Sequence, residues 1–385
     1  MLFSEFSSST KEDWEKQARR ELTTSFSELQ TKLEKDIVLQ PIYTNEDLKL
    51  DLPPLLEYAP WINLPACACT NIQETKTVAL YLLEQGADGC FFDLTSQNSE
   101  LVTDFLQQLT VLSTQKAIAC RVNFSEKQID AFLLMASRLH RGFIQFASLD
   151  LMYQDAKQKT AYVHFLNTII PKLPEGHSFQ LISISETHHQ TVVEQIAYHL
   201  ALAIDWIDQL TQAGMKLESV LNQIVFSLPI HSNYFLEITK LRAVRILWQR
   251  IIEEGYGLKK SKCNQVFIHS INTARLDTPI ENNIIRHTVQ AMAAVLGGCT
   301  YLSLFPYNQS LQAADPFSYR FSAHISSILK EEAYFDKVID PSRGSFFLEN
   351  LTHQLVEKSW NLLKEIEQAG GYAKKIQPIQ KTNKV

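Results

Sequence analysis

Two adjacent histidines stand beside a carboxylate and several hydroxyls in one short stretch of the chain. Residues 183–191 read Ser-Ile-Ser-Glu-Thr-His-His-Gln-Thr and follow an apolar run of β type. His188 is a candidate for general acid–base work, because an imidazole exchanges protons near neutral pH. His188 and His189 would point to opposite faces of an extended segment, so they cannot easily chelate one metal ion together. Glu186 and Asp150 are candidate co-ligands, and a hydrogen-bonded or solvent-facing histidine is the competing interpretation.

Polar residues also follow the other predicted strands. They include a single cation, Arg275, whereas a site for a phosphorylated or carboxylated substrate usually has several cations or a glycine-rich turn. The chain has 12 glycines and contains no GxGxxG, P-loop, GxSxG or HExxH pattern. The further candidates are Asp93, Thr95, Ser96, Asn123, Glu126, Ser185, Ser227, His231, Asn272, Tyr307 and Asn308.

The elements that must position these side chains alternate regularly along the chain. Short apolar runs predict eight strands, and an amphipathic helix follows each of them. The predicted strands cover residues 62–70, 89–94, 117–123, 143–149, 179–184, 223–228, 265–270 and 300–305. The predicted helices cover residues 74–85, 99–112, 125–141, 156–170, 191–213, 234–254, 280–296 and 315–332.

Eight strand–helix units predict an α/β protein with the architecture of a (β/α)8 TIM barrel. The strands are nearly continuous apolar runs, which is typical of parallel strands that are buried on both faces. A doubly wound open sheet is the alternative. In a barrel, functional groups lie on the loops at the carboxyl ends of the strands, where the candidates of this sequence fall.

Two flanking segments extend the predicted barrel, which occupies residues 61–335. Residues 1–60 form an N-terminal arm, with a polar helix predicted over 11–35 and an extended, proline-containing segment after it. The arm has little core of its own, so we expect it to pack on the barrel or to wrap a partner. Residues 336–385 form a C-terminal extension with a helix over 351–368 and a polar tail.

Composition excludes several classes of protein. The chain has 385 residues, 45% of them hydrophobic, and a net charge of -6. This net negative charge argues against a nucleic-acid-binding protein, which would need a cluster of positive charge. No apolar run approaches the ~20 residues that span a bilayer, and the N-terminus lacks the pattern of a secretory signal. We therefore expect a cytoplasmic protein. Its six cysteines form no CxxC pair, and we expect them to be reduced and buried.

Several segments resemble the substrate-barrel domain of methylmalonyl-CoA mutases. The resemblance is carried by residues 13–22, 37–48, 233–248, 281–298 and 337–360, and it covers nearly the whole chain. Its most specific parts are the Gly-Gly pair at 297–298 and the Asp-Pro…Gly-Ser pattern within 340–345. In this family the barrel binds an acyl-CoA along its axis, and a separate flavodoxin-like domain with an Asp-x-His-x-x-Gly motif brings in cobalamin. That motif is absent here.

The resemblance places the opening stretch on an active site. His188 falls on the position of the family's active-site histidine, and Ser183 and Ser185 are retained. We treat all three as vestigial candidates for substrate binding, with His188 also a vestigial catalytic candidate, because other positions have lost their chemistry. Gln223 and Val225 stand where the family has an arginine and a serine, and Pro316 stands where the family has a carboxylate that contacts the cofactor. Residues 303–305 replace the family's His-Thr-Asn, and residues 324–326 replace its Asn-Thr-Gln. Tyr58 does not lie at the spacing of the family's catalytic tyrosine.

These losses favour a pseudoenzyme over an enzyme. A lost hydrogen bond to a charged group typically costs about 1.5–3 kcal/mol, so several losses together remove orders of magnitude in rate. The resemblance therefore implies the non-catalytic small (beta) subunit of a heterodimeric methylmalonyl-CoA mutase, an isomerase of propionate metabolism. Its large (alpha) subunit would carry adenosylcobalamin and convert methylmalonyl-CoA to succinyl-CoA. This chain would bind no cofactor and no metal.

Two other hypotheses remain open. The first is an active acyl-CoA mutase barrel that works with a separate cobalamin-binding subunit, which would make His188 essential. The second is a homodimeric barrel that binds an unrelated small ligand in a remodelled cavity. The sequence leaves open whether the cavity is filled, whether residual acyl-CoA binds and whether the isolated chain forms a homodimer.

Overall fold

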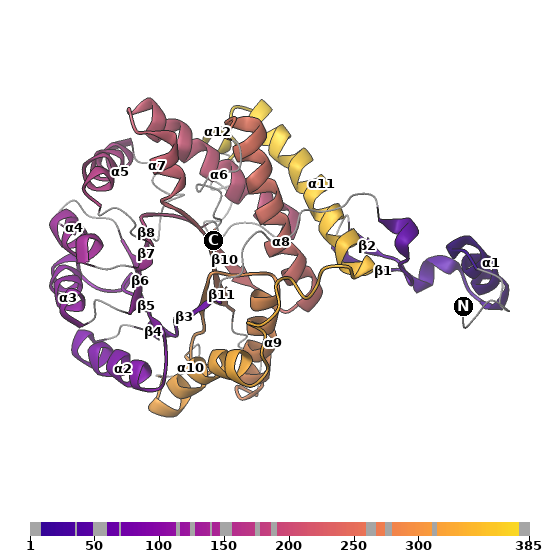
Figure 1. Ribbon diagram of the computed structural model, residues 1–385, viewed down its shortest axis with the longest axis horizontal. Helices are drawn as coiled ribbons and strands as arrows, with labels where there is room; N and C mark the ends of the chain where they lie inside the picture. Colours follow the sequence, from indigo (N-terminus) through magenta and orange to yellow (C-terminus); the bar gives the residue numbers. More distant parts are fainter. Residues whose placement is uncertain are drawn as a thin grey trace, which may run out of the picture.

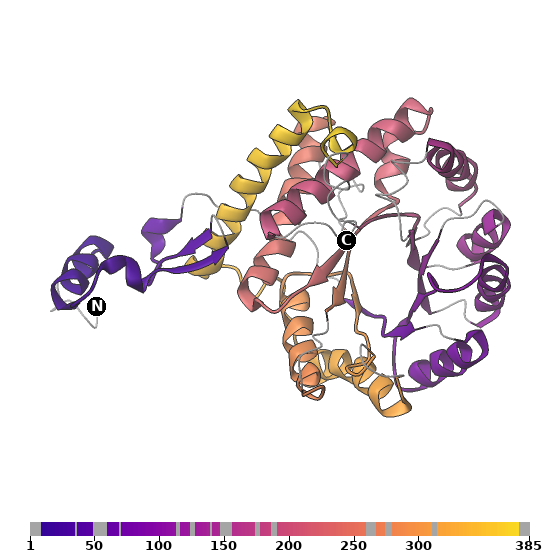
Figure 2. The ribbon, with the colours of Figure 1, turned by 180° about the vertical axis from the view of Figure 1, so that it is seen from behind.

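The computed structural model shows strands enclosed by a layer of helices, with an arm that projects from this body (Figure 1). It describes residues 9–34, 37–48, 60–68, 71–112, 116–123, 128–138, 141–146, 156–173, 178–185, 191–258, 267–273, 279–309 and 314–376. The same arrangement is visible from behind (Figure 2). Within these residues, no helix combines the length and the apolar character needed to cross a membrane.

The strands of the body form two five-stranded parallel sheets. One sheet has the order β3-β12-β11-β10-β9 and the other β4-β5-β6-β7-β8. The first sheet contains β3 (Ile62–Asn63), β9 (Ile182–Ile184), β10 (Ile224–Ile230), β11 (Phe267–Asn272) and β12 (Tyr301–Ser303). The second contains β4 (Ala66–Ala68), β5 (Gly89–Asp93), β6 (Ala117–Val122), β7 (Arg141–Phe146) and β8 (Ser178–Gln180). The predicted α/β class with parallel strands is confirmed.

The two sheets are continuous in the chain at both of their outer strands. Leu64 and Pro65 separate β3 from β4, and Leu181 separates β8 from β9. The Leu64 N–H donates to the Leu302 carbonyl at 2.9 Å, and the Phe91 N–H donates to the Pro65 carbonyl at 3.1 Å. Hydrogen bonds of residues 64 and 65 therefore connect both sheets where β3 ends and β4 begins. The sequence predicted one strand over 62–70 and one over 179–184, and each is divided in the structure.

The helices between the strands follow the predicted order. They are α2 (Ile72–Glu84), α3 (Ser99–Leu112), α4 (Ile129–Arg138), α5 (Ala156–Ile169), α6 (Val192–Gln212), α8 (Tyr234–Arg250), α9 (Asn282–Leu296) and α10 (Pro316–Glu331). Short helical segments are added by η5 (Ile170–Lys172), α7 (Leu217–Leu221) and the π-helical turn η6 (Ile251–Gly255). Because every parallel step needs a crossover, this alternation of strand and helix produces the parallel sheets.

Alternate side chains of each strand enter two different apolar clusters. Cys90 and Phe92 of β5 belong to the main core beneath the helices, whereas Phe91 belongs to a second cluster between the sheets. We call this second set the central cluster; it comprises Ile62, Leu64, Ala66, Phe91, Ala117, Ala119, Phe143, Val225 and Tyr301. Gly89 begins β5 because a Cβ there would lie 1.8 Å from the Ala117 carbonyl oxygen.

A long C-terminal helix covers one side of the body. Helix α11 (Phe346–Gln368) packs against α6 and α8, and α12 (Tyr372–Ile376) follows it (Figure 1). The start of α11 lies five residues before the predicted start at residue 351, because Ser345 caps its first turn through the Leu348 N–H. Arg242 of α8 pairs with Glu349 at 2.9 Å and with Asp340 at 3.3 Å.

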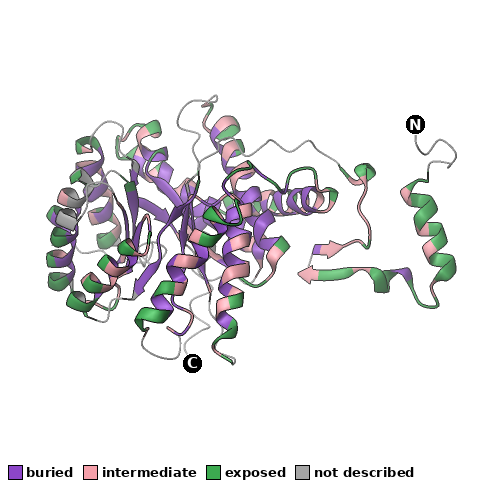
Figure 3. Ribbon diagram, turned by 60° about the horizontal axis from the view of Figure 1, so that its bottom comes forward, coloured by how far each residue is buried: buried purple, intermediate pink, exposed green. Residues whose placement is uncertain are grey.

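The N-terminal arm differs from its prediction. Helix α1 (Lys11–Glu21) ends well before residue 35, and η1 (Phe26–Leu29), β1 (Thr31–Glu34), β2 (Ile37–Leu39) and η2 (Asn45–Asp47) follow it. The β-branched and serine residues at 23–25 disfavour a continuing helix, and the Ser25 hydroxyl accepts the Ser27 N–H at the start of η1. Most of the arm is exposed, in contrast to the buried strands (Figure 3).

The cysteine expectation is confirmed where it can be assessed. Cys67, Cys90, Cys120 and Cys299 are buried. Cys69 and Cys263 lie outside the described residues. The four buried thiols act as small apolar groups at strand positions and beside them.

Replacing Arg242 with alanine should lower the free energy of unfolding by about 3–5 kcal/mol, because the carboxylates of Asp340 and Glu349 would stay buried without their cation. Urea unfolding followed by circular dichroism measures this loss. The matched control is Lys16→Ala, which breaks an exposed pair with Glu12 and should cost less than about 1 kcal/mol. Equal losses in the two variants would contradict the assignment.

Candidate functional site

Aromatic rings from four strands meet at the centre of the body. The His269 ring centroid lies 4.7 Å from that of Phe143 and 5.1 Å from that of Phe91. Phe143 in turn lies 5.2 Å from Tyr301, and all four side chains are fully buried. These spacings are those of rings in contact. The strands thus point bulky groups inward and fill the space between the two sheets.

A chain of polar groups lies against these rings. The Ser227 hydroxyl is 2.8 Å from His269 Nδ1 and 3.4 Å from the Oε1 atom of Gln145. In the same cluster, the Tyr301 hydroxyl donates to Gln180 Oε1 at 3.0 Å. Burial lowers the pKa of His269 to about 3, and the positive charge of Arg121 acts in the same direction. The imidazole is therefore neutral at physiological pH.

An ion pair lies at the carboxyl ends of two neighbouring strands. Arg121 of β6 is 3.5 Å from the carboxylate of Asp93 on β5, and both side chains are partly exposed. The Thr95 hydroxyl donates to the same carboxylate at 2.7 Å, and the Asn123 amide donates to the Thr95 carbonyl at 2.8 Å. The sequence analysis named Asp93, Thr95 and Asn123 as candidates. Their hydrogen bonds connect the end of β5 to the end of β6.

Several buried polar atoms near this layer have no hydrogen-bond partner. They are Ser183 Oγ, Ser303 Oγ, His269 Nε2 and Arg121 Nε. Ser227 and His269 have the spacing of a nucleophile and its base. However, Ser227 is 3% exposed and His269 is fully buried beneath the aromatic rings, so neither can meet a substrate in this structure.

The opening stretch is only partly described. Ser183 is buried at the end of β9, and Ser185 is half-buried just beyond it. His188 lies outside the described residues, as do Glu186 and His189. The structure therefore does not test whether Ser183, Ser185 and His188 come together.

The other candidate residues lie in different environments. Asn272 accepts the Phe305 N–H at 2.6 Å through its side-chain oxygen, and Asn308 is fully buried. His231 is exposed, and Ser96 and Tyr307 lie in connections after their strands. Glu126, Asp150, Arg275 and Tyr58 lie outside the described residues.

Several substituted positions have structural roles. Val225 belongs to the central cluster, where Phe305 packs against it, and Gln223 is buried at the start of β10. Pro316 occupies the first turn of α10, which Asp315 caps by accepting the Ser318 N–H at 2.7 Å. The Ser326 hydroxyl accepts the Trp61 indole N–H at 2.8 Å. These side chains take part in apolar packing, helix capping and a buried hydrogen bond.

Sequence reasoning missed the residues that fill the centre. His269, Gln145 and Arg121 lie within strands, whereas the candidates were taken from the segments after strands. The alternation of side chains along β11 was the available signal, because Ile268 joins the main core and His269 must then face inward.

The described residues do not fit a corrinoid or a metal ion. No group of three or more histidine, cysteine, aspartate or glutamate side chains in the described ranges could hold a metal. The unpartnered Nε2 of His269 is the type of atom that coordinates cobalt, but it lies among Phe91 and Phe143 with no exposed surface.

The sequence model of the family described as methylmalonyl-CoA mutase matches residues 156–384. The chain belongs to the methylmalonyl-CoA mutase family. It is 26% identical over 316 residues to the methylmalonyl-CoA mutase small subunit of Porphyromonas gingivalis, covering 78% of this chain and 51% of that protein. It is 27% identical over 398 residues to the large subunit of the same organism, covering 89% of this chain and 56% of that subunit.

A third relative is a methylmalonyl-CoA mutase of Rhizobium meliloti, which is 33% identical over 210 residues and matches 52% of this chain and 29% of its own length. The chain thus spans roughly half or less of the length of these mutases. One glycine of this chain has a clear packing role. At Gly297 a Cβ would lie 2.9 Å from the Leu241 side chain, so the glycine allows α9 to approach α8.

The neutral state of His269 predicts a pH dependence of stability. The folded pKa of about 3 lies below the ordinary histidine pKa of 6.5, so the unfolded chain binds more protons between these pH values and the stability decreases as the pH is lowered. One pKa unit corresponds to about 1.4 kcal/mol, so His269 should cost the protein about 2 kcal/mol between pH 7 and pH 5. His269→Leu should remove that part of the slope in urea unfolding curves. An unchanged slope would show that His269 does not stay neutral.

Proposed function

We propose that this chain is the non-catalytic small subunit of a heterodimeric, adenosylcobalamin-dependent methylmalonyl-CoA mutase. The large subunit would carry the cofactor and isomerise methylmalonyl-CoA to succinyl-CoA, and this chain would stabilise it. The observation that carries the proposal is the contact among Phe91, Phe143, His269 and Tyr301 at the centre of the body.

The two sheets together form one closed (β/α)8 barrel in this proposal. Contacts across both breaks support closure: the Ala66 N–H of β4 donates to the Leu304 carbonyl just after β12 at 3.0 Å, and β7 of one sheet lies beside β9 of the other. The central cluster then lies on the barrel axis, where family members bind acyl-CoA. With rings in van der Waals contact there, an acyl-CoA chain would have to displace them.

The loss of polar groups supports the same conclusion. Val225 and Phe305 present hydrocarbon where the family has serine and asparagine, and the Arg121 guanidinium is already paired with Asp93. A transition state with developing charge needs preorganised donors, and removal of one donor typically costs about 2.7–4 kcal/mol. Several such losses leave a scaffold without the reaction.

The three parts of the chain have separate roles in this proposal. Residues 61–335 form the barrel, residues 336–385 extend it with α11, and residues 1–60 are the arm that contacts the large subunit. The exposed α1 supports this role, since it has no buried residue, and Trp14 and Leu29 of the arm are exposed. A cytoplasmic location and a place in propionate metabolism follow from the proposed mutase.

The alternative is an active acyl-CoA mutase barrel that works with a separate cobalamin-binding chain. His188→Ala separates the two: it should leave the turnover of an assembled complex nearly unchanged if the large subunit holds the active site. A loss of two or more orders of magnitude would favour the alternative.

Acyl-CoA binding should require space at the barrel axis. Isothermal titration of the isolated chain with a CoA thioester should give no saturable heat, because the four rings occupy the path. The double variant Phe91→Ala/Phe143→Ala opens that path, and a control with Phe105→Ala removes a ring of the main core instead. Micromolar binding to the unaltered chain would contradict the filled axis.

The arm should be needed for assembly. The chain should co-purify with a cobalamin-binding large subunit at a 1:1 ratio, whereas removal of residues 1–30 should weaken the complex at least about tenfold, which corresponds to ~1.4 kcal/mol. Size-exclusion chromatography with light scattering measures both. Unchanged assembly after the truncation would show that the barrel alone forms the interface.

A further inference from the structure

We draw no further inference here: the strongest candidate, the surface patch formed by the exposed apolar side chains of Ile285 on α9 and of Phe317 and Ile328 on α10, carries none because nothing in the structure shows what covers it.

Discussion

Close packing of aromatic rings at the centre of the body is the constraint on which the rest depends. Phe91, Phe143, His269 and Tyr301 come from four strands, and each ring contacts at least one other in the set. Protein interiors are packed as densely as organic crystals, so such a cluster excludes any other molecule from the same volume. The same contacts hold the sheets at a fixed separation and fill the space between them.

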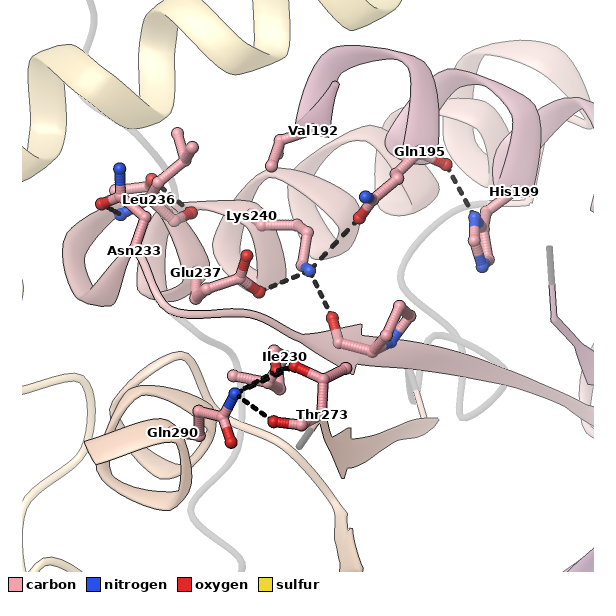
Figure 4. Close-up of polar contacts among 12 residues, drawn as sticks. Val192, Gln195, His199, Ile230, Asn233, Leu236, Glu237, Lys240, Thr273 and Gln290 are labelled. Carbon is pink, nitrogen blue, oxygen red and sulfur yellow. Dashed lines mark hydrogen bonds and ion pairs between the residues drawn. The ribbon is translucent and has the colours of Figure 1, made fainter. Parts of the chain in front are cut away.

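Buried charges hold the helices around this centre. Arg242 connects α8 to Glu349 on α11 and to Asp340, while Lys240 connects α8 to α6 and to the end of β10 (Figure 4). The segment with Asp340, Pro341, Gly344 and Ser345 anchors helix α11: the Gly344 N–H donates to Glu349 at 3.1 Å. An ion pair of the kind that Arg242 forms is costly to break once it is buried.

The arm combines a docked tip with an exposed remainder. Its tip is held by Ile37 in the core and by Glu34 on α6, whereas α1 is stabilised mainly by contacts within the arm, such as Arg19 over the Phe26 ring at 4.2 Å. Trp14 and Leu29 of the arm are exposed apolar side chains. The arm is thus attached at one end and exposed at the other.

The sequence by itself determined the alternation of strands and helices, the parallel sheets and the family, because hydrophobic periodicity and helix caps are local. It also identified Asp93, Thr95 and Ser183 at strand ends. It failed on the arm: the predicted helix over 11–35 ends at Glu21, because the β-branched and serine residues at 23–25 disfavour a continuing helix, and the hairpin after it is held by burial of Ile37. The filled centre was decided only by the tertiary structure. Whether Phe91 touches Phe143 and His269 depends on strand register and on the approach of two sheets, and neither is encoded in any single segment.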